Sequence, residues 1–392
     1  MTRDILYLAA AYLRAHKGKT LILSVCLGAA LALPLTVRVA VGILQAEMTR
    51  RAADTPLVIG AAGSRFDLVL HALNFRTAAP AGVTRAAADA VTVGGHAEAI
   101  PLHVRFTARG YPVVGTSLEY FALRGLVPAS GHVMTRLGDV VVGWGVARAL
   151  DLQPGDWLRS DPDNVFDLAG AYPLEMRVTG ILARSRTPDD HAVFVDLNTA
   201  WMLEGIGHGH AELDTLDDPT AVLAREGSRV TASPALELYT RITPETLDTF
   251  HFHGDPATFP LTAVIAVPLD DRAATLLLGR YLDRETGLQA LRPAMVVDEL
   301  LGMVVRLKRF FDAQHAVVLA ITALLMALVM ALSLRLRRRE FETLHRLGCS
   351  RGTVAALQAA ELCVLLLLGS LLALLAGAAA APAARLWIRT LT

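Results

Sequence analysis

The sequence predicts an α+β membrane protein with three transmembrane helices and a large two-lobed α+β extracytoplasmic domain between the first and the second. Three long apolar segments, at residues 20–37, 316–334 and 353–381, each approach the roughly 20 residues that a helix needs to cross a bilayer. The 392 residues have a mean hydropathy of +0.44, which indicates that a good part of the apolar content lies in membrane spans. That middle region mixes short strand patterns with helical patterns, as expected for an α+β domain.

Residues 1–19 predict an interfacial amphipathic helix. Its apolar residues fall on one helical face, away from the charged side chains; they are Ile5, Leu6, Leu8, Ala9, Tyr12 and Leu13. Such a helix lies on the inner leaflet with its apolar face in the lipid. A cleaved signal peptide is the alternative, but the apolar run that follows is long and lies behind a leader of about 19 residues. We therefore favour an uncleaved anchor.

The three apolar segments lie within longer predicted elements. Residues 20–45 form the first transmembrane helix and a stalk, with a kink expected at Pro34. Residues 299–336 form a second stalk that leads directly into the second span, and residues 353–381 form the third span, followed by a short C-terminal tail at 382–392. Several small residues would allow the spans to pack closely; they are Gly28, Ala29, Ala32, Gly369 and Ala373.

Basic residues gather mainly at one end of the predicted spans. Some precede the first span and others follow the second; they are Arg3, Arg14, Lys17, Lys19, Arg335, Arg337, Arg338, Arg339, Arg346 and Arg351. Lysine and arginine near span ends are retained in the cytoplasm. The N-terminus and residues 337–352 are therefore expected in the cytoplasm, and residues 46–298 on the other side of the membrane. Arg385 and Arg389, after the third span, are a mild departure from this rule.

The middle region, residues 46–298, contains distinct strand and helix patterns. Short apolar runs at 140–143, 192–195 and 262–268 are typical of buried strands, and helical periodicity occurs at 65–73, 145–150 and 273–282. A polar break at 207–235 predicts a lobe boundary or a flexible insert. All three cysteines lie outside this region, so we expect neither a disulfide nor a cysteine zinc site there. The net charge of zero gives no argument for nucleic-acid binding.

Residues 337–352 form a short, basic, amphipathic stretch between the second and third apolar segments. With the two residues that follow, it reads RRREFETLHRLGCSRGTV and resembles the signature of the FtsX/MacB/LolC-type ABC permeases. The matching parts are Arg338-Arg339-Glu340, Leu344 to Gly348, and Ser350-Arg351. Glu361, on the third apolar segment, matches a recurrent acid of that family. Residues 54–60, 115–117 and 131–143 also resemble elements of MacB-type periplasmic domains.

The resemblance implies a role and partners for the chain. It implies a MacB-like periplasmic domain at 46–298, a location in the bacterial inner membrane, and a homodimer or paired permease bound to a cytoplasmic ABC ATPase that holds ATP and Mg²⁺. A periplasmic or outer-membrane partner would accompany export. The family usually has four spans, whereas this sequence predicts three, because residues 382–392 are too short to cross a bilayer.

The resemblance also gives residues 337–352 a function as a coupling helix that docks into a groove of the ATPase. Leu344 and Leu347 would supply apolar contacts, and Gly348 would end the helix. The charged residues of this interface would be Arg338, Arg339, Glu340 and Arg351. The alternative is an ordinary cytoplasmic loop, whose basic residues would reflect only the retention of lysine and arginine in the cytoplasm. The leucine spacing and the glycine stop favour the coupling interpretation.

Glu361 has two interpretations. Inside the bilayer a carboxylate is costly and should face protein. Near the inner boundary of the membrane it would simply be interfacial. The sequence leaves both open.

We expect no nucleotide site and no catalytic site in this chain. Gly18-Lys19-Thr20 imitates the end of a phosphate-binding loop, but Leu13 occupies the position of the first glycine and an apolar span follows. Residues 46–298 contain neither Gly-x-Ser-x-Gly nor His-Glu-x-x-His. The carboxylates beside a histidine at 187–191 are interpreted as a solvated turn. ATP hydrolysis is therefore expected in a partner subunit.

Two histidine pairs stand out in the middle region: His208 with His210, and His251 with His253. In a strand, a spacing of two residues places both side chains on one face. Two such pairs could bind Zn²⁺ or Cu²⁺, with His191 or Asp255 as a further ligand. The alternative is a set of turn and surface histidines that do not share a location.

Three functions are compatible with these observations. The first, which we favour, is a permease subunit that transmits ATP-driven motion to a periplasmic domain for export or extraction of a periplasmic or membrane substrate. The second is a non-transporting membrane regulator of a periplasmic partner such as a cell-wall hydrolase. The third is a zinc-related component for uptake or sensing, which would depend on the histidine pairs.

Overall fold

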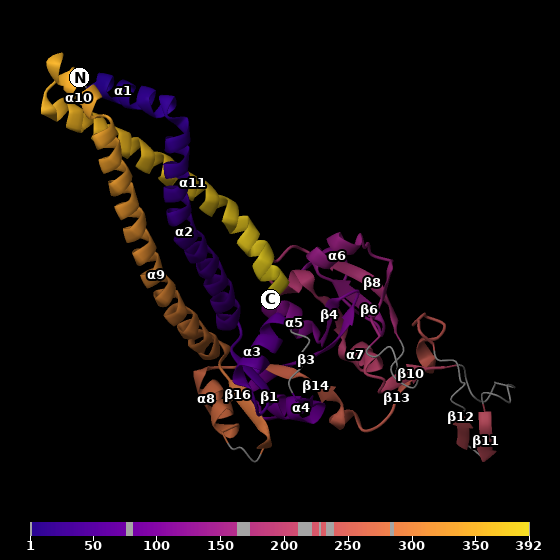
Figure 1. Ribbon diagram of the computed structural model, residues 1–392. Coiled ribbons are helices and arrows are strands. Elements are labelled where there is room, and N and C mark those ends of the chain that lie inside the picture. The colour runs from indigo at the N-terminus through magenta and orange to yellow at the C-terminus, as the bar shows by residue number, and fades with distance from the viewer. Residues whose placement is uncertain are drawn as a thin grey trace. The chain divides into compact units, whose positions relative to one another are not determined.

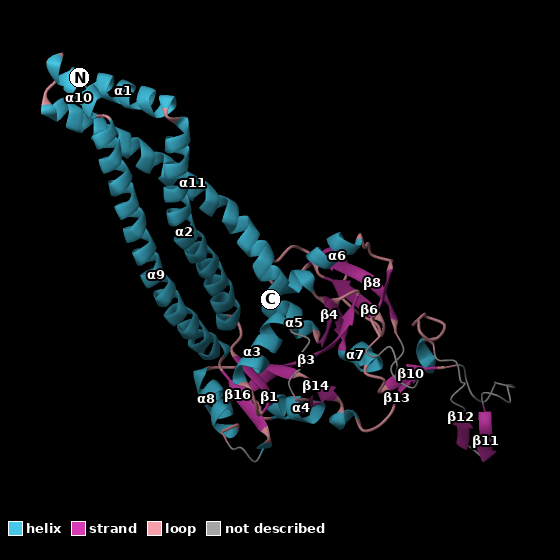
Figure 2. Ribbon diagram, viewed as in Figure 1, coloured by secondary structure: helices cyan, strands magenta, loops and turns pink. Residues whose placement is uncertain are grey.

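The computed structural model describes residues 2–75, 81–162, 173–210, 222–226, 229–232, 239–282 and 286–391. The chain divides into two compact units. One contains residues 1–47 and 300–391, which we call the membrane unit, and the other contains residues 48–299, which we call the outer domain. The membrane unit is helical, whereas the strands belong to the outer domain (Figure 2).

The membrane unit is built from α1 (Thr2–Ala15), α2 (Lys17–Ala53), α9 (Pro293–Leu336), α10 (Arg338–Arg346) and α11 (Arg351–Leu391). Three helical segments are long and apolar enough to cross a membrane: Lys17–Ala53, Arg309–Leu336 and Arg351–Ala380. The predicted set of three spans is therefore confirmed. Figure 1 shows α1 and α10 at the same end of these helices.

Two glycines let α2 and α11 approach each other closely. A Cβ atom on Gly28 would lie 3.0 Å from the Cβ atom of Leu372, and one on Gly369 would lie 2.6 Å from a methyl carbon of Leu27. Larger side chains at either glycine would push the helices apart, because the neighbouring atoms already fill the space. Both glycines are among the small residues that the sequence indicated for packing between spans.

Several helix ends differ from the sequence-based boundaries. α1 ends at Ala15, before the expected boundary at residue 19, and α9 begins at Pro293, before the expected stalk at 299. Proline fits the first turn of a helix because its missing N–H needs no partner there. α11 continues through Pro382 to Leu391, so the segment described above as a tail is helical up to that residue. The alanine-rich sequence around Pro382 favours helix and offsets the lost hydrogen bond.

A ten-stranded mixed sheet runs through the described part of the outer domain. Its order is β16-β1-β15-β3-β4-β9-β6-β8-β5, and β7 pairs with β8. The strands are β1 (Leu57–Ala61), β3 (Ala97–Ala108), β4 (Tyr111–Thr116), β5 (Pro128–Gly131), β6 (Asp139–Val142), β7 (Trp157–Arg159), β8 (Glu175–Leu182), β9 (Val193–Asp196), β15 (Ala263–Pro268) and β16 (Leu288–Leu291). The parallel pairs are β4 with β9 and β6 with β8. The three predicted strands correspond to β6, β9 and β15, whose nearly continuous apolar sequences suit strands buried on both faces.

Short helices accompany this sheet: α3 (Arg65–Asn74), α4 (Arg85–Val93), α5 (Leu118–Arg124), α6 (Trp144–Leu150), α7 (Leu197–Leu203) and α8 (Asp271–Arg280). The helical patterns at 65–73, 145–150 and 273–282 correspond to α3, α6 and α8. Side-chain oxygens of Ser64 and Asp270 accept hydrogen bonds from the first turns of α3 and α8, at 3.3 and 2.7 Å, and cap these helices. Phe194, Met176 and Trp201 belong to three buried apolar clusters that form the core.

Smaller elements complete the described part of the outer domain. β2 (Val83–Thr84) pairs with β14 (Pro260–Leu261), β10 (Gly207–Gly209) with β13 (Phe250–Phe252), and β11 (Val222–Glu226) with β12 (Arg229–Ala232). Three short 3₁₀ helices are η1 (Pro188–His191), η2 (Leu247–Thr249) and η3 (Pro256–Thr258). The polar break predicted at 207–235 contains β10, His210, β11 and β12, and the rest of it lies outside the described residues.

A buried ion pair anchors the last turn of α2 within the outer domain. Nη1 and Nη2 of Arg51 donate to the two carboxylate oxygens of Asp189 at 2.6 and 3.0 Å, and Nε donates to the Leu73 carbonyl. The hydroxyls of Tyr120 and Thr187 each donate to Asp189 at 2.7 Å. Burial alone would raise the pKa of Asp189, but the charge and hydrogen bonds of Arg51 lower it to about 2. The interpretation of residues 187–191 as a solvated turn is therefore wrong.

Candidate functional site

α10 connects the second and third spans at one end of the membrane unit (Figure 1). Glu340 in its first turn and Arg346 in its last turn complement the helix dipole, whereas Arg338 and Arg339 in the first turn oppose it. Gly348 follows with a φ of 92°, a left-handed conformation that glycine adopts readily and that ends helices. Ser350 Oγ then accepts a hydrogen bond from the N–H of Thr353 at 3.1 Å and caps the start of α11. The two helices are thus separated by a short, well-defined turn.

Arg337 lies just before α10 and joins it to other helices of the membrane unit. Its Nη1 donates to Glu361 Oε1 at 3.0 Å, and its Nε donates to Glu340 Oε2 at 2.9 Å. The guanidinium carbon lies 3.7 Å from the centre of the Tyr12 ring, within the range of cation–π contacts. Burial alone would lower the pKa of Arg337, but the hydrogen bonds to the two glutamates raise it above its usual value. A permanently charged Arg337 therefore connects α10 to α11 and α1.

Glu361 is buried on α11, with 4% of its side chain exposed, and it faces Arg337. Of the two interpretations that the sequence left open, this is the one in which the carboxylate faces protein. A buried carboxylate in an apolar helix is costly without a partner of opposite charge. Arg337 provides that partner.

The residues that the sequence assigned to ATPase docking lie on the surface around α10. The side chain of Arg338 is 83% exposed and pairs only loosely with Glu342, at 3.3 Å. Leu347 is 76% exposed, whereas Leu344 is half-buried. The remaining exposed members of the set are Arg339, Glu340, Gly348 and Arg351. An exposed leucine among arginines gives this surface both an apolar contact and a positive charge.

The sequence pattern did not single out Arg337 as a contact residue. It belongs to a run of three arginines, and the run itself does not reveal which member faces inward. Its neighbours Arg338 and Arg339 are exposed, whereas Arg337 is largely buried. One signal was available, because Glu340 follows Arg337 by three residues, a spacing that suits an ion pair on a helix.

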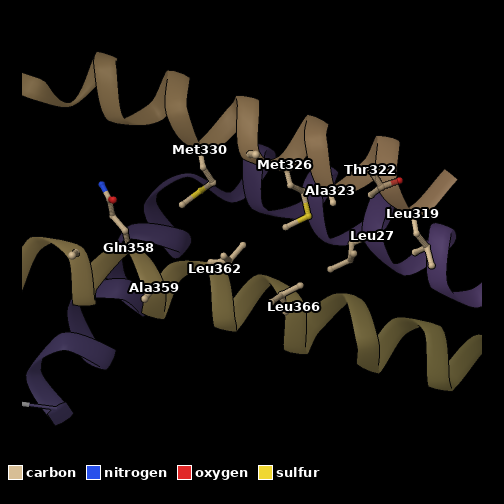
Figure 3. A pocket seen from close by; sticks show the side chains of 12 residues that line it. Leu27, Leu319, Thr322, Ala323, Met326, Met330, Gln358, Ala359, Leu362 and Leu366 are labelled. Atoms are coloured by element: carbon tan, nitrogen blue, oxygen red, sulfur yellow. The ribbon is translucent and has the colours of Figure 1, made fainter. Parts of the chain in front are cut away.

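A cavity of about 660 Å³ lies within the membrane unit, between α9 and α11 (Figure 3). Apolar side chains from three helices dominate its lining; they include Leu27, Met326, Met330, Leu362 and Leu366. Thr322 and Gln358 add polar atoms to its wall. This lining suits a hydrocarbon occupant better than a charged one.

The two histidine pairs come together in the outer domain. β10 and β13 pair antiparallel with His208 directly opposite His251, and strand alternation places His210 and His253 on the same face. The ring centre of His208 lies 4.8 Å from those of His251 and His253 and 5.5 Å from that of His210. A nitrogen atom from each of His208, His210 and His251 lies within 4.8 Å of the other two. Among the described residues, this is the one such group of histidine, cysteine or acidic side chains.

The extra ligands suggested by the sequence do not join this group. The ring of His191 lies close to Gly145, and the carboxylate of Asp255 caps η3 by accepting from the Ala257 N–H at 3.0 Å. Within the cluster, burial and the charges that neighbouring histidines would carry lower the pKa of His208 to about 4. His208 is therefore neutral at neutral pH, in the form that has a lone pair for a ligand.

Comparison with known proteins finds similarity in both parts of the chain. Residues 315–391 match the FtsX-like permease C-terminal family. Among solved structures, the periplasmic region of MacB from Actinobacillus actinomycetemcomitans is similar with a TM-score of 0.36 and 10% identity, over 63% of this chain and 92% of that one. The extracellular domain of the noncanonic ABC-type transporter YknZ from Gram-positive bacteria is similar with a TM-score of 0.33 and 13% identity, over 60% of this chain and 98% of that one. No curated protein matches the sequence.

Proposed function

We propose that this chain, whose residues 315–391 match the FtsX-like permease C-terminal family, is the membrane subunit of an ABC-type transport system. In this role it transmits ATP-driven motion from a separate cytoplasmic ATPase to the outer domain, for export or extraction of a periplasmic or membrane substrate. The observation that carries the proposal is the set of contacts made by Arg337. Those contacts join the exposed α10 to two other helices of the membrane unit.

The distribution of charge supports an orientation for the subunit. Exposed arginines surround α10, and Lys17 and Lys19 begin α2, at the end of the membrane unit where α1 also lies. Basic residues at span ends favour the cytoplasm. We therefore place the N-terminus and α10 in the cytoplasm of a bacterial cell and the outer domain in the periplasm, with the spans in the inner membrane.

Helix continuity supports transmission of motion. α9 is one helix from Pro293 to Leu336, a length of about 66 Å at 1.5 Å per residue. It contributes residues to both units, as α2 does. Only Arg337 separates the end of α9 from the start of α10. A displacement of α10 is therefore expected to move α9 and, through the ion pair with Glu361, α11.

The surface around α10 supports an ATPase as the partner. Leu347 would enter an apolar pocket, and the arginines would face acidic residues at its rim, which is how charged rims steer and orient association. ATP and Mg²⁺ would be bound by that partner. Two copies of the chain, or this chain and a related permease, would engage two ATPase subunits.

The test is co-purification of the full chain with its ATPase from membranes, with and without the change Leu347→Asp. We expect the substitution to reduce the bound ATPase at least about tenfold, because a charge would replace a buried apolar contact. The double change of Leu344 and Leu347 to Asp should abolish binding. Since Leu344 is half-buried, the single change is the cleaner measurement.

A matched control is Leu269→Asp. Leu269 is 78% exposed, close to the value for Leu347, but it lies in the outer domain. The control should retain the ATPase. If the Leu347→Asp protein retains it as well, docking through α10 is wrong.

A further inference from the structure

The histidines on β10 and β13 have no part in coupling to an ATPase. We propose that His208, His210 and His251 form a binding site for a divalent transition-metal ion, with Zn²⁺ as the expected occupant. His253 stands at the edge of the site, 4.8 Å from both His208 and His251 between ring centres. The proposal is independent of the coupling function, because it concerns other residues and another ligand.

The local sequence explains why these rings meet. The segments read Gly-His-Gly-His and Phe-His-Phe-His, so both alternate with the period of a strand. On the face opposite the histidines, each glycine of β10 lies across from a phenylalanine of β13: Gly207 from Phe252 and Gly209 from Phe250. A Cβ atom on Gly207 or Gly209 would lie 2.8 or 2.7 Å from the facing phenylalanine ring. Only glycine leaves room for these rings, and this packing fixes the register.

Register matters because a slip of one residue would turn every histidine of one strand to the other face. Backbone hydrogen bonds extend the pairing beyond the strands. The N–H of His253 donates to the Ile206 carbonyl at 2.9 Å, and the N–H of Tyr239 donates to the Gly209 carbonyl at 2.8 Å. The histidines are therefore presented from a defined backbone, which favours metal binding over a chance grouping of surface rings.

The tautomer of His251 is set by its neighbour. Its Nδ1 lies 3.0 Å from the carbonyl oxygen of Thr249. A carbonyl can only accept, so Nδ1 carries the proton and Nε2 of the neutral ring carries the lone pair. A backbone carbonyl bound to the second nitrogen is the usual outer-shell partner of a histidine that ligates metal.

The donor set indicates the class of ion. Imidazole nitrogens suit Zn²⁺, Cu²⁺ and Ni²⁺, whereas Mg²⁺ and Ca²⁺ prefer oxygen ligands. Ligands at about 2.05 Å from a tetrahedral Zn²⁺ are separated by about 3.3 Å, somewhat less than the 4.8 Å within which the three nitrogens lie. Side-chain rotation closes this difference, because the three rings are only half-buried. Three imidazoles leave a fourth position for water or for His253, and half-burial allows the ion to exchange with solvent.

The experiment is a Zn²⁺ titration of the full chain, purified in lipid nanodiscs with a tag that contains no histidine and stripped with a chelator. Equilibrium dialysis followed by elemental analysis should give one tightly bound Zn²⁺ per chain. The double variant His208→Ala, His251→Ala should lose at least about 100-fold in affinity, since even outer-shell changes cost 10- to 100-fold. Excess Mg²⁺ should not compete.

The matched control changes two exposed histidines outside the cluster, His96→Ala with His132→Ala, and should bind Zn²⁺ like the unchanged chain. Because alanine could disturb β10 and β13, a second variant, His208→Gln with His251→Gln, keeps polar side chains of similar length and should lose the metal as well. Bound Co²⁺ should show the intense visible absorption of a tetrahedral site in the unchanged chain and the control only. The proposal is overturned if the unchanged chain binds no stoichiometric Zn²⁺, or if both double variants bind it as tightly as the control.

Discussion

Both parts of the molecule contain a buried arginine–carboxylate pair, and the two pairs differ in how completely they are enclosed. In the outer domain, Arg51 binds both oxygens of Asp189, and two hydroxyls complete the coordination of the carboxylate. In the membrane unit, Arg337 divides its hydrogen bonds between buried Glu361 and Glu340, whose side chain is 64% exposed. Arg51 therefore has a single, enclosed carboxylate partner, and Arg337 has one enclosed and one solvated carboxylate partner.

The Arg51–Asp189 contact is therefore fixed, whereas Arg337 can shift its hydrogen bonds between its two glutamates. A buried charge that loses its partner of opposite charge costs several kcal/mol, so the Arg51 pair holds the last turn of α2 in one arrangement. Arg337 can shift toward Glu340 without losing all of its compensation, because Glu340 lies at the solvent-exposed start of α10. We infer that α10 can adjust where it meets a partner, whereas the last turn of α2 stays fixed within the outer domain.

Asp189→Asn should produce the largest effect. The amide keeps the shape of the side chain but leaves the Arg51 charge buried without a partner of opposite charge, which costs about 3–5 kcal/mol. For a domain of this size the unfolding midpoint should fall by roughly 10 °C, measured on the full chain in detergent by thermal melting. The control is Glu175→Gln, which breaks the more exposed pair with Arg241 and should cost less than about 1 kcal/mol. If the two variants lowered the unfolding midpoint equally, the buried pair would contribute no more to stability than the exposed pair.

Glu361→Gln should have an intermediate effect, confined to the membrane unit. Arg337 would keep Glu340 and the Tyr12 ring, so we expect a loss of about 1–2 kcal/mol rather than the larger loss at Asp189. Hydrogen exchange of the amides in α10 should accelerate about 5- to 30-fold in lipid nanodiscs, since that is the corresponding change in the population of opened states. The unfolding midpoint of the outer domain should not change. Unaltered exchange in α10 would mean that the ion pair does not hold the helix.

The fold was largely predictable because its signals are local. Long apolar runs identify the spans at any position in the chain, and the continuity of α9 follows from a helical pattern that leads into the second span. The buried strands β6 and β9 are short apolar runs bounded by turns. Sheet order was not predictable, because neighbours such as β1 and β15 are about two hundred residues apart and pair through packing rather than local sequence.

The sites were predictable in residue type but not in geometry. The spacing of the histidines indicated one face per strand, but nothing local pairs β10 with β13, since that pairing depends on phenylalanine rings over glycines. The Arg51–Asp189 pair joins residues separated by 138 positions and has no sequence signature. The run of arginines before α10 indicated a charged helix, yet the inward-facing member is decided by where α10 begins and by the position of Glu361 on the next helix.

Glu340→Gln should produce the smallest effect and makes the sharpest comparison, because it removes the other carboxylate of the same arginine. Its side chain is mostly exposed, so water replaces much of the lost interaction and we expect a change of about 0.5 kcal/mol or less. Hydrogen exchange in α10, measured as for Glu361→Gln, should accelerate less than about threefold. Because both variants neutralise a partner of Arg337 without changing side-chain length, their ratio compares how strongly the two carboxylates hold α10. If the Glu340 variant had the larger effect, Arg337 would be held mainly from within its own helix, and the ion pair with α11 would not be the contact that transmits motion.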